Sequence, residues 1–162
     1  MSVVTVLEAI AIIGSGLTAG VFYAFSTFVM AALARLPPDQ GIAAMNSINI
    51  TVINPWFMTV FLGTPFVCAI LVVMALVKWS EPGAALILVA SLIYIVGSLV
   101  VTMVFNVPLN NTLAAITSSA GEGGVLWTRY VSDWTFWNGV RTAAPLLAMV
   151  LFIWGVLQRS AA

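Results

Sequence analysis

The sequence predicts an all-α protein, an integral membrane four-helix bundle with short interfacial helices in its first and third connections. Of the 162 residues, 62% are hydrophobic and only 6% are charged, whereas a soluble domain normally carries about 25% charged residues. Four stretches are apolar over the roughly 20 residues that a helix needs to cross a bilayer. Unpaired backbone groups are too costly in hydrocarbon for an open sheet, so a helical bundle is the expected fold.

The chain is expected to form one transmembrane domain, residues 1–162. The spans are predicted at about 3–33, 55–77, 84–105 and 140–157. The tight turn 78–83 makes the second and third spans antiparallel neighbours. Four spans place both termini on one side of the membrane. Basic residues are nearly balanced between the two faces, and we expect a bacterial inner (plasma) membrane with cytoplasmic termini.

The first and third connections are long and lie on the same face of the membrane. After the break at Pro37–Pro38, residues 41–53 are expected to form a short helix of mixed polarity. The third connection contains a polar tract at 117–124, interpreted as a loop tip, and then a series of aromatic residues. Tryptophan and tyrosine concentrate at membrane interfaces, so this elaborated face is where a functional site is expected.

Composition excludes several classes of function. The chain has no histidine, which removes the usual ligand for haem, zinc, copper or di-iron centres and the commonest general base. We therefore predict neither a metal nor a cofactor. The single cysteine, Cys68, allows no disulfide within the chain. Net charge is zero and no basic block occurs, so no nucleic-acid partner is expected.

One polar stripe enters the fourth span from the elaborated face. Trp134, Trp137, Asn138 and Arg141 follow the spacing i, i+3, i+4, i+7 and share one side of a helix. Pro145 has no N–H, so the Arg141 carbonyl loses its helical partner. An arginine here suits a planar anionic or oxygen-rich ligand. The alternative is that Arg141 extends to lipid headgroups or binds loop carbonyls.

Asparagines gather on the same membrane face. Asn106 and Asn110 close the third span, and Asn49 lies in the predicted short helix. Asparagine is also favoured at helix caps and turns, which is the structural alternative. For Asn106 and Asn110, as for Asn138, we expect an inward-facing polar site rather than caps alone.

The first span adds polar residues at both of its ends. Tyr23 and Ser26 are expected to share a face near the asparagines. Gly16 and Gly20 form a small-residue ridge that allows close packing within the bundle or between subunits. Glu8 lies 18 residues before Ser26, about 27 Å along a helix. It is therefore expected at the opposite membrane face, interfacial or paired across an oligomer contact.

Six short segments occur in a characteristic order: Gly20–Ser26, Leu36–Pro38, Met45–Asn49, Asn54–Pro55, Asn106–Asn110 and Trp137–Thr142. With this order and spacing, nearly the whole chain resembles the anthrone-oxygenase-like family of small four-helix membrane proteins. The resemblance implies the oxidation of anthrones to anthraquinones without an evident metal, as associated with fungal members; most bacterial relatives have no assigned activity. Family members often carry a histidine after the Trp–Asn pair, where this chain has Gly139.

The first functional hypothesis is a cofactor-independent oxygenase acting on an anthrone-like phenolic compound. Arg141, Asn138 and Tyr23 are its candidate catalytic residues, since preorganised donors can stabilise a developing oxyanion. The candidate substrate-binding residues are Asn106, Asn110, Asn49, Ser26, Trp134 and Trp137. The nearest carboxylate in sequence, Asp133, lies two turns before Arg141, so no convincing general base is evident.

Two other hypotheses remain open. The same polar cluster predicts a pocket for a hydrophobic aromatic or lipid-like molecule, which a non-catalytic binding or carrier protein would also have. The lack of histidine and of a buried carboxylate pair favours this hypothesis. The chain is alternatively a structural subunit of a homo-oligomer, associating through the Gly16–Gly20 ridge.

Overall fold

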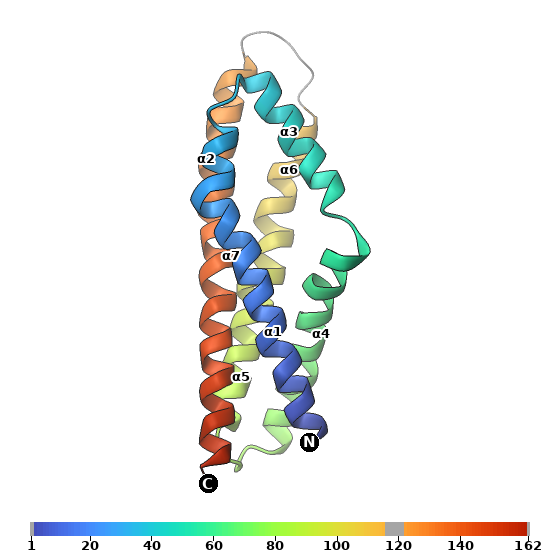
Figure 1. Cartoon of the computed structure of the whole chain (residues 1–162), viewed down its shortest axis with the longest axis vertical. Coiled ribbons are helices and arrows are strands. Elements are labelled where there is room, and N and C mark those ends of the chain that lie inside the picture. The colour runs from blue at the N-terminus through green and yellow to red at the C-terminus, as the bar shows by residue number, and fades with distance from the viewer. Residues whose placement is uncertain (1, 116–121, 162) are drawn as a thin grey trace.

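The computed structural model describes residues 2–115 and 122–161, so most of the polar tract at 117–124 lies outside the described part. Within these ranges the chain is helical and has no strand. Helices long and apolar enough to cross a membrane run over Val3–Leu33, Pro55–Val77, Ala84–Ala114 and Gly123–Ser160. Figure 1 shows them side by side, with both termini at one end. The prediction of an all-α membrane bundle is confirmed.

The first helix contains α1 (Val3–Ala24), a π-helical turn η1 (Phe25–Val29) and α2 (Met30–Leu33). The third contains α5 (Ala84–Tyr94), π-helical η2 (Ile95–Val100) and η3 (Thr102–Asn106), and then α6 (Val107–Ala114). It continues beyond residue 105, where the span was expected to end. Pro108 directly follows the π-helical turn η3, where the hydrogen-bond pattern of the continuous helix is already irregular and the missing N–H is tolerated.

The last helix, α7 (Glu122–Ser160), has 39 residues and begins well before residue 140. At 1.5 Å per residue it is about 58 Å long, nearly twice the hydrocarbon thickness of about 30 Å. By contrast, α4 (Pro55–Val77) has 23 residues and is close to one bilayer in length. The end of α7 remote from the C-terminus therefore projects beyond the hydrocarbon core.

The first connection forms α3 (Pro38–Thr51), which begins with a proline at its first position. Figure 1 shows α3 at the end remote from the termini, leading into α4. Asn54 caps α4, because its Oδ1 accepts a 3.1 Å hydrogen bond from the Phe57 amide. In the third connection the described helices are continuous with the spans: α6 extends the third span and the first turns of α7 precede the fourth.

The core has two parts. Near the termini, Leu71, Tyr94 and Phe152 are buried among α1, α4, α5 and α7. At the α3 end the buried residues are larger and more aromatic: Met30, Met45, Leu113, Trp127, Tyr130 and Trp134. Gly16 lies against Met149 of α7, so this glycine packs within the chain. The α3 end thus has its own core, built from the long connections.

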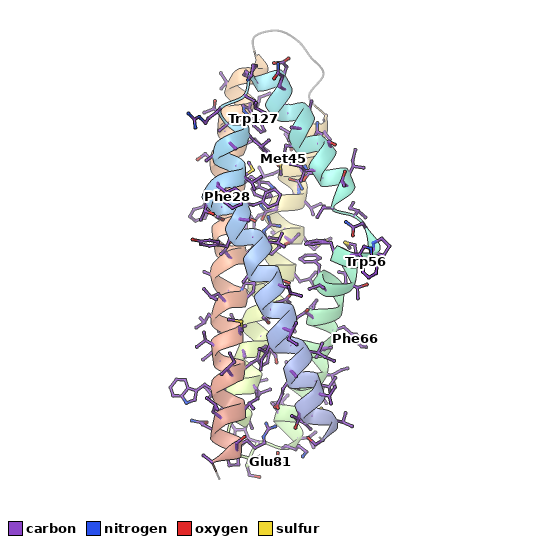
Figure 2. The ribbon with its side chains drawn as sticks, in the orientation of Figure 1. Phe28, Met45, Trp56, Phe66, Glu81 and Trp127 are labelled. Carbon is purple, nitrogen blue, oxygen red and sulfur yellow. The ribbon has the colours of Figure 1, made fainter. Side chains whose placement is uncertain are left out.

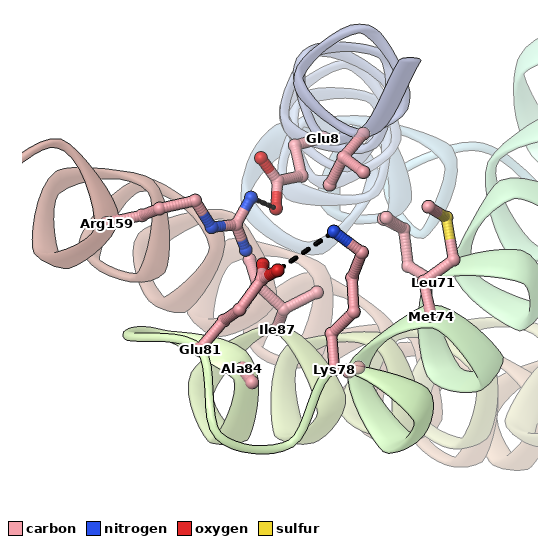
Figure 3. Close-up of a pocket in the computed structure, with 10 residues that line it drawn as sticks. Glu8, Leu71, Met74, Lys78, Glu81, Ala84, Ile87 and Arg159 are labelled. Atoms are coloured by element: carbon pink, nitrogen blue, oxygen red, sulfur yellow. Dashed lines mark hydrogen bonds and ion pairs between the residues drawn. The ribbon is translucent and has the colours of Figure 1, made fainter. Parts of the chain in front are cut away.

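Two ion pairs close the end that carries the termini (Figure 3). Buried Glu8 binds Arg159 at 2.8 Å, and Lys78 binds Glu81 at 2.9 Å. Glu8 therefore has a partner within its own chain, 151 residues away in sequence. The space left among these residues is only ≈ 10 Å³, about enough for one water molecule.

Candidate functional site

A cavity of ≈ 410 Å³ lies at the α3 end of the bundle. This volume is within the range of roughly 300–1,000 Å³ that is usual for small-molecule sites. The wall is mostly apolar and includes five aromatic side chains, Phe22, Phe25, Phe57, Phe61 and Trp134. Its polar lining residues are Asn49, Thr102, Asn110 and Arg141. Figure 2 labels Met45, a fully buried lining residue, in this half of the bundle.

Arg141 is the charged group of the cavity and is only 5% exposed. Its Nη2 donates to Asn138 Oδ1 at 2.8 Å and its Nη1 donates to Thr102 Oγ1 at 3.2 Å. The guanidinium lies over the Phe22 ring at 4.3 Å and near the Trp134 ring at 5.0 Å, which favours a cation. Arg141 therefore points into the bundle rather than towards lipid headgroups.

Asn138 connects Arg141 to the first helix. Its Nδ2 donates to the Phe22 carbonyl and to Ser26 Oγ, both at 2.7 Å. These two bonds use both amide hydrogens, so its Oδ1 is free to accept from Arg141. The contact lies where α1 passes into the π-helical turn η1, and such turns often occur at functional sites.

Thr102 supports Arg141 from the third helix. Its hydroxyl donates to the Ser98 carbonyl at 2.7 Å, which leaves Oγ1 as an acceptor for the guanidinium. Ser98 and Thr102 belong to the two consecutive π-helical segments η2 and η3. The first and third helices thus meet α7 at this guanidinium, each at the level of its own π-helical turns.

Asn110 organises a second polar position. Its Oδ1 accepts from Tyr130 Oη and from Trp134 Nε1, each at 2.9 Å. An indole N–H can only donate, so the Asn110 oxygen must face Trp134 and its amide nitrogen faces elsewhere. Asn49 also lines the cavity, and its side chain lies beside the Tyr130 hydroxyl. Tyr130, Trp134, Asn110 and Asn49 therefore form one polar group at this side of the cavity.

The unused polar groups of this cavity are mainly donors. Arg141 has five N–H groups and uses two of them within the protein, while its buried Nε has no partner. No carboxylate is among the residues lining the cavity, and none of the ion pairs found in the described ranges includes Arg141. Such a site suits an anionic or acceptor oxygen on an otherwise apolar, aromatic molecule.

Five of the nine residues predicted for the site are not part of the cavity wall; Asn138 and Ser26 lie directly behind Arg141, and the other three are placed as follows. Tyr23 is 60% exposed on the outer surface, because the inward face of the first helix follows Phe22 and Ser26 instead. Trp137 stacks on Phe105, with ring centroids 3.5 Å apart and planes 6° apart. Asn106 is buried beside the cavity, where it donates to the Trp134 carbonyl at 3.2 Å.

The other predicted residues gather at the cavity. Arg141, Asn110, Asn49 and Trp134 line it, and Asn138 holds Arg141, with Ser26 behind. Sequence reasoning missed Thr102 and the phenylalanines. A threonine in an apolar helix usually bonds its own backbone, and phenylalanine is common in any span, so neither carried a distinguishing signal.

Comparison with known proteins identifies the family. A family model described as anthrone oxygenase matches residues 57–151. This match covers more than half of the chain. The chain belongs to the anthrone oxygenase family.

The match agrees with the resemblance found from the sequence motifs. It contains Thr102, Asn110, Asn138 and Arg141. Neither a curated protein nor a solved structure gave a significant match to this anthrone oxygenase family member.

Proposed function

We propose that this membrane protein is a cofactor-independent oxygenase that oxidises an anthrone-type phenolic compound in the ≈ 410 Å³ cavity. The observation that carries the proposal is the buried guanidinium of Arg141, which has unused donors in an aromatic, carboxylate-free cavity. The family membership supports the same chemistry.

The shape of the cavity supports a flat substrate. Phe22 and Phe61 meet edge to face at 6.3 Å, and Phe57 stacks on Phe61 at 5.5 Å. Phe25 and Trp134 also line the cavity, with ring centroids 5.7 Å apart. Aromatic side chains bind fused rings by stacking and edge contacts. The substrate oxygen would then lie at Arg141, the charged position in the wall.

The role of Arg141 is to stabilise an enolate. An anthrone is a carbon acid, and loss of a proton from its methylene carbon moves negative charge to the ketone oxygen. Donors already held in place by Asn138 and Thr102 stabilise that charge without reorganisation. The wall supplies no carboxylate or histidine, so the guanidinium makes the substrate more acidic, and a water molecule inside the cavity relays the released proton to the peroxide that forms in the next step.

The reaction needs only molecular oxygen as co-reactant. The enolate carbon adds O₂, and the resulting peroxide takes up a proton to give a hydroperoxide. Loss of water, with the second methylene hydrogen, then forms the new carbonyl. One oxygen atom enters the quinone and the other leaves as water, so anthrone and O₂ yield anthraquinone and H₂O.

The test is oxygen uptake by the purified protein in liposomes with anthrone, and protein-free liposomes measure spontaneous oxidation. We expect anthraquinone as product and a loss of about 10²- to 10³-fold in kcat for Arg141→Gln. Arg141→Lys keeps the charge but loses the paired geometry, and should retain part of the activity. Turnover unaffected by Arg141→Gln would refute the oxyanion role.

The same experiment addresses the non-catalytic alternative, which the lack of a titratable carboxylate or histidine in the wall favours. A binding protein would leave anthrone oxidation at or below the protein-free rate. The anthrone that is bound to the protein would be recovered unchanged.

A further inference from the structure

We propose that the cavity is loaded sideways from the bilayer, with the substrate oxygen entering first. This inference rests on the proposed function and narrows its substrate class. The substrate would be an uncharged aromatic ketone or phenol that dissolves among the acyl chains and has its oxygen at one end. Analogues of this substrate with a charged group at the end opposite the oxygen would not enter the cavity.

The exposed part of the wall is entirely apolar. The lining residues with more than a third of their surface exposed are Val21, Leu62, Met103 and Ile53. Met103 on η3 is 58% exposed and Ile53, between α3 and α4, is 71% exposed. We call these four exposed residues the mouth of the cavity. Their side chains offer no hydrogen bond to water or to a polar solute.

The polar lining residues lie deeper. Thr102 and Arg141 are buried, and Asn49 and Asn110 are half-buried. The cavity therefore has an apolar opening and a donor-rich interior. A molecule with one oxygen-bearing end fits this arrangement in one direction only, with the oxygen inward and the rings towards the mouth.

The mouth extends from Ile53, just before the start of α4, to a depth where the bilayer is apolar. Leu62 is the eighth residue of α4, about 10 Å along the helix from Pro55. Since α4 is close to one bilayer in length, Leu62 lies within the acyl region rather than among the headgroups. On its inner side α4 packs along α1, α5 and η2, and shares little contact with η3, which carries Met103. Lipid chains are thus the expected medium in front of the mouth.

Two methionines allow the path to be tested without turnover. Met45 is fully buried in the cluster with Trp134, and Met103 stands at the mouth. Benzophenone is an uncharged diaryl ketone that, when irradiated, attaches to nearby C–H bonds and favours methionine. Irradiation of the protein in phosphatidylcholine liposomes, followed by digestion and mass spectrometry, reports which methionine the ketone carbon reaches.

We expect benzophenone to label Met45 in the wild-type protein. Met103→Trp and Leu62→Trp fill the mouth from its two sides and should each lower Met45 labelling about tenfold, whereas the volume-conserving Met103→Leu should not. An effect of Leu62→Trp alone would still identify the mouth, should Met103→Trp fail to fold. Met45 labelling that is absent in the wild type, or unchanged in both tryptophan variants, overturns the proposal.

The water-soluble 4-carboxybenzophenone separates the two routes. If the cavity opened to water, the carboxylate would be attracted to Arg141 and Met45 labelling would match or exceed that by benzophenone. If the cavity is loaded from lipid, the carboxylated probe should label Met45 at least about tenfold more weakly than benzophenone does. The reason is that moving a carboxylate into the acyl region costs free energy. Strong labelling by the carboxylated probe therefore refutes lateral loading. Benzophenone labelling without anthrone oxidation would instead refute the proposed function alone.

Discussion

The side-chain amide of Asn138 donates a 2.7 Å hydrogen bond to the main-chain carbonyl of Phe22, and thereby ties α7 to the first helix. The same side chain accepts a 2.8 Å bond from Arg141. The position of the guanidinium therefore depends on the backbone of a helix more than a hundred residues away in sequence. This relationship makes Asn138 a positioning residue for Arg141.

Asn138→Asp should disturb both the position and the charge of Arg141. The carboxylate still accepts from Arg141, but it cannot donate to Phe22, and it neutralises the guanidinium that the enolate needs. We expect anthrone turnover to fall by about 10- to 100-fold. The matched control is Asn111→Asp on the exposed side of α6, which should leave turnover unchanged. Wild-type turnover in Asn138→Asp would contradict the positioning role.

Thr102→Val removes one acceptor of Arg141 with little change in volume. The guanidinium loses its 3.2 Å bond to Oγ1, and another of its donors becomes unpaired in a buried site. The expected loss in kcat/KM is about tenfold, equivalent to roughly 1.4 kcal/mol. Thr112→Val on α6, whose exposed hydroxyl bonds only its own helix, serves as control in the oxygen-uptake assay.

The pair of Glu8 and Arg159 should contribute to stability rather than to activity. Arg159→Gln leaves a buried carboxylate without its partner and should cost about 1–3 kcal/mol. Glu8→Gln combined with Arg159→Gln should cost less than the sum of the two single changes. Thermal unfolding in detergent of the wild type, the two single variants and the double variant completes this double-mutant cycle. Strict additivity would mean that the ion pair is not formed.

Gly97 is a position where alanine should destabilise the bundle. A methyl group there would collide with Ala144 of α7, and overpacking costs about 1–3 kcal/mol. Gly63 in α4 has open space instead. Gly63→Ala should therefore be neutral or stabilising, because alanine is the better helix former by about 1 kcal/mol. The melting temperatures of the two variants should shift in opposite directions, or only Gly97→Ala should shift.

Acid should weaken the 78–83 turn. A hydrogen bond from Lys78 holds the pKa of the Glu81 carboxyl below its ordinary value of 4.5, and the Lys78 and Arg159 charges add to this effect. Because the folded pKa lies below the unfolded one, the stabilisation is present above pH 4.5 and is lost as the pH falls through the lowered value. Between pH 7 and 3, the wild type should lose slightly more thermal stability than Glu81→Gln. Equal losses would contradict the assigned cause.

Much of the fold followed from the sequence because lipid imposes a simple constraint. A helix must be apolar over one bilayer thickness, and the stretch 55–77 coincides with α4. The lengths of the third and fourth helices were less predictable. Pro108 and the polar turns before Val140 look like helix ends in sequence, but packing among the long connections keeps those segments helical.

The candidate site was predictable where helical spacing aligned its residues. Trp134, Asn138 and Arg141 share one face of α7, as the spacing indicated. Tyr23 was misplaced because its neighbour Phe22 takes the inward direction, and adjacent residues on a helix point about 100° apart. The link between Glu8 and Arg159 spans nearly the whole chain, and a single sequence holds no signal for such a pair.

The π-helical turn at Phe25–Val29 amounts to one residue more than an α-helix of the same rise would hold. Deleting a single residue there would return the turn to α-helical geometry, and the helix on either side would keep its orientation because the wider turn itself takes up the extra residue. Only residues within the turn, among them Ser26 that Asn138 binds, would change direction. Differences in length at this turn between family members would therefore alter the support of Arg141 while leaving the rest of the wall in place.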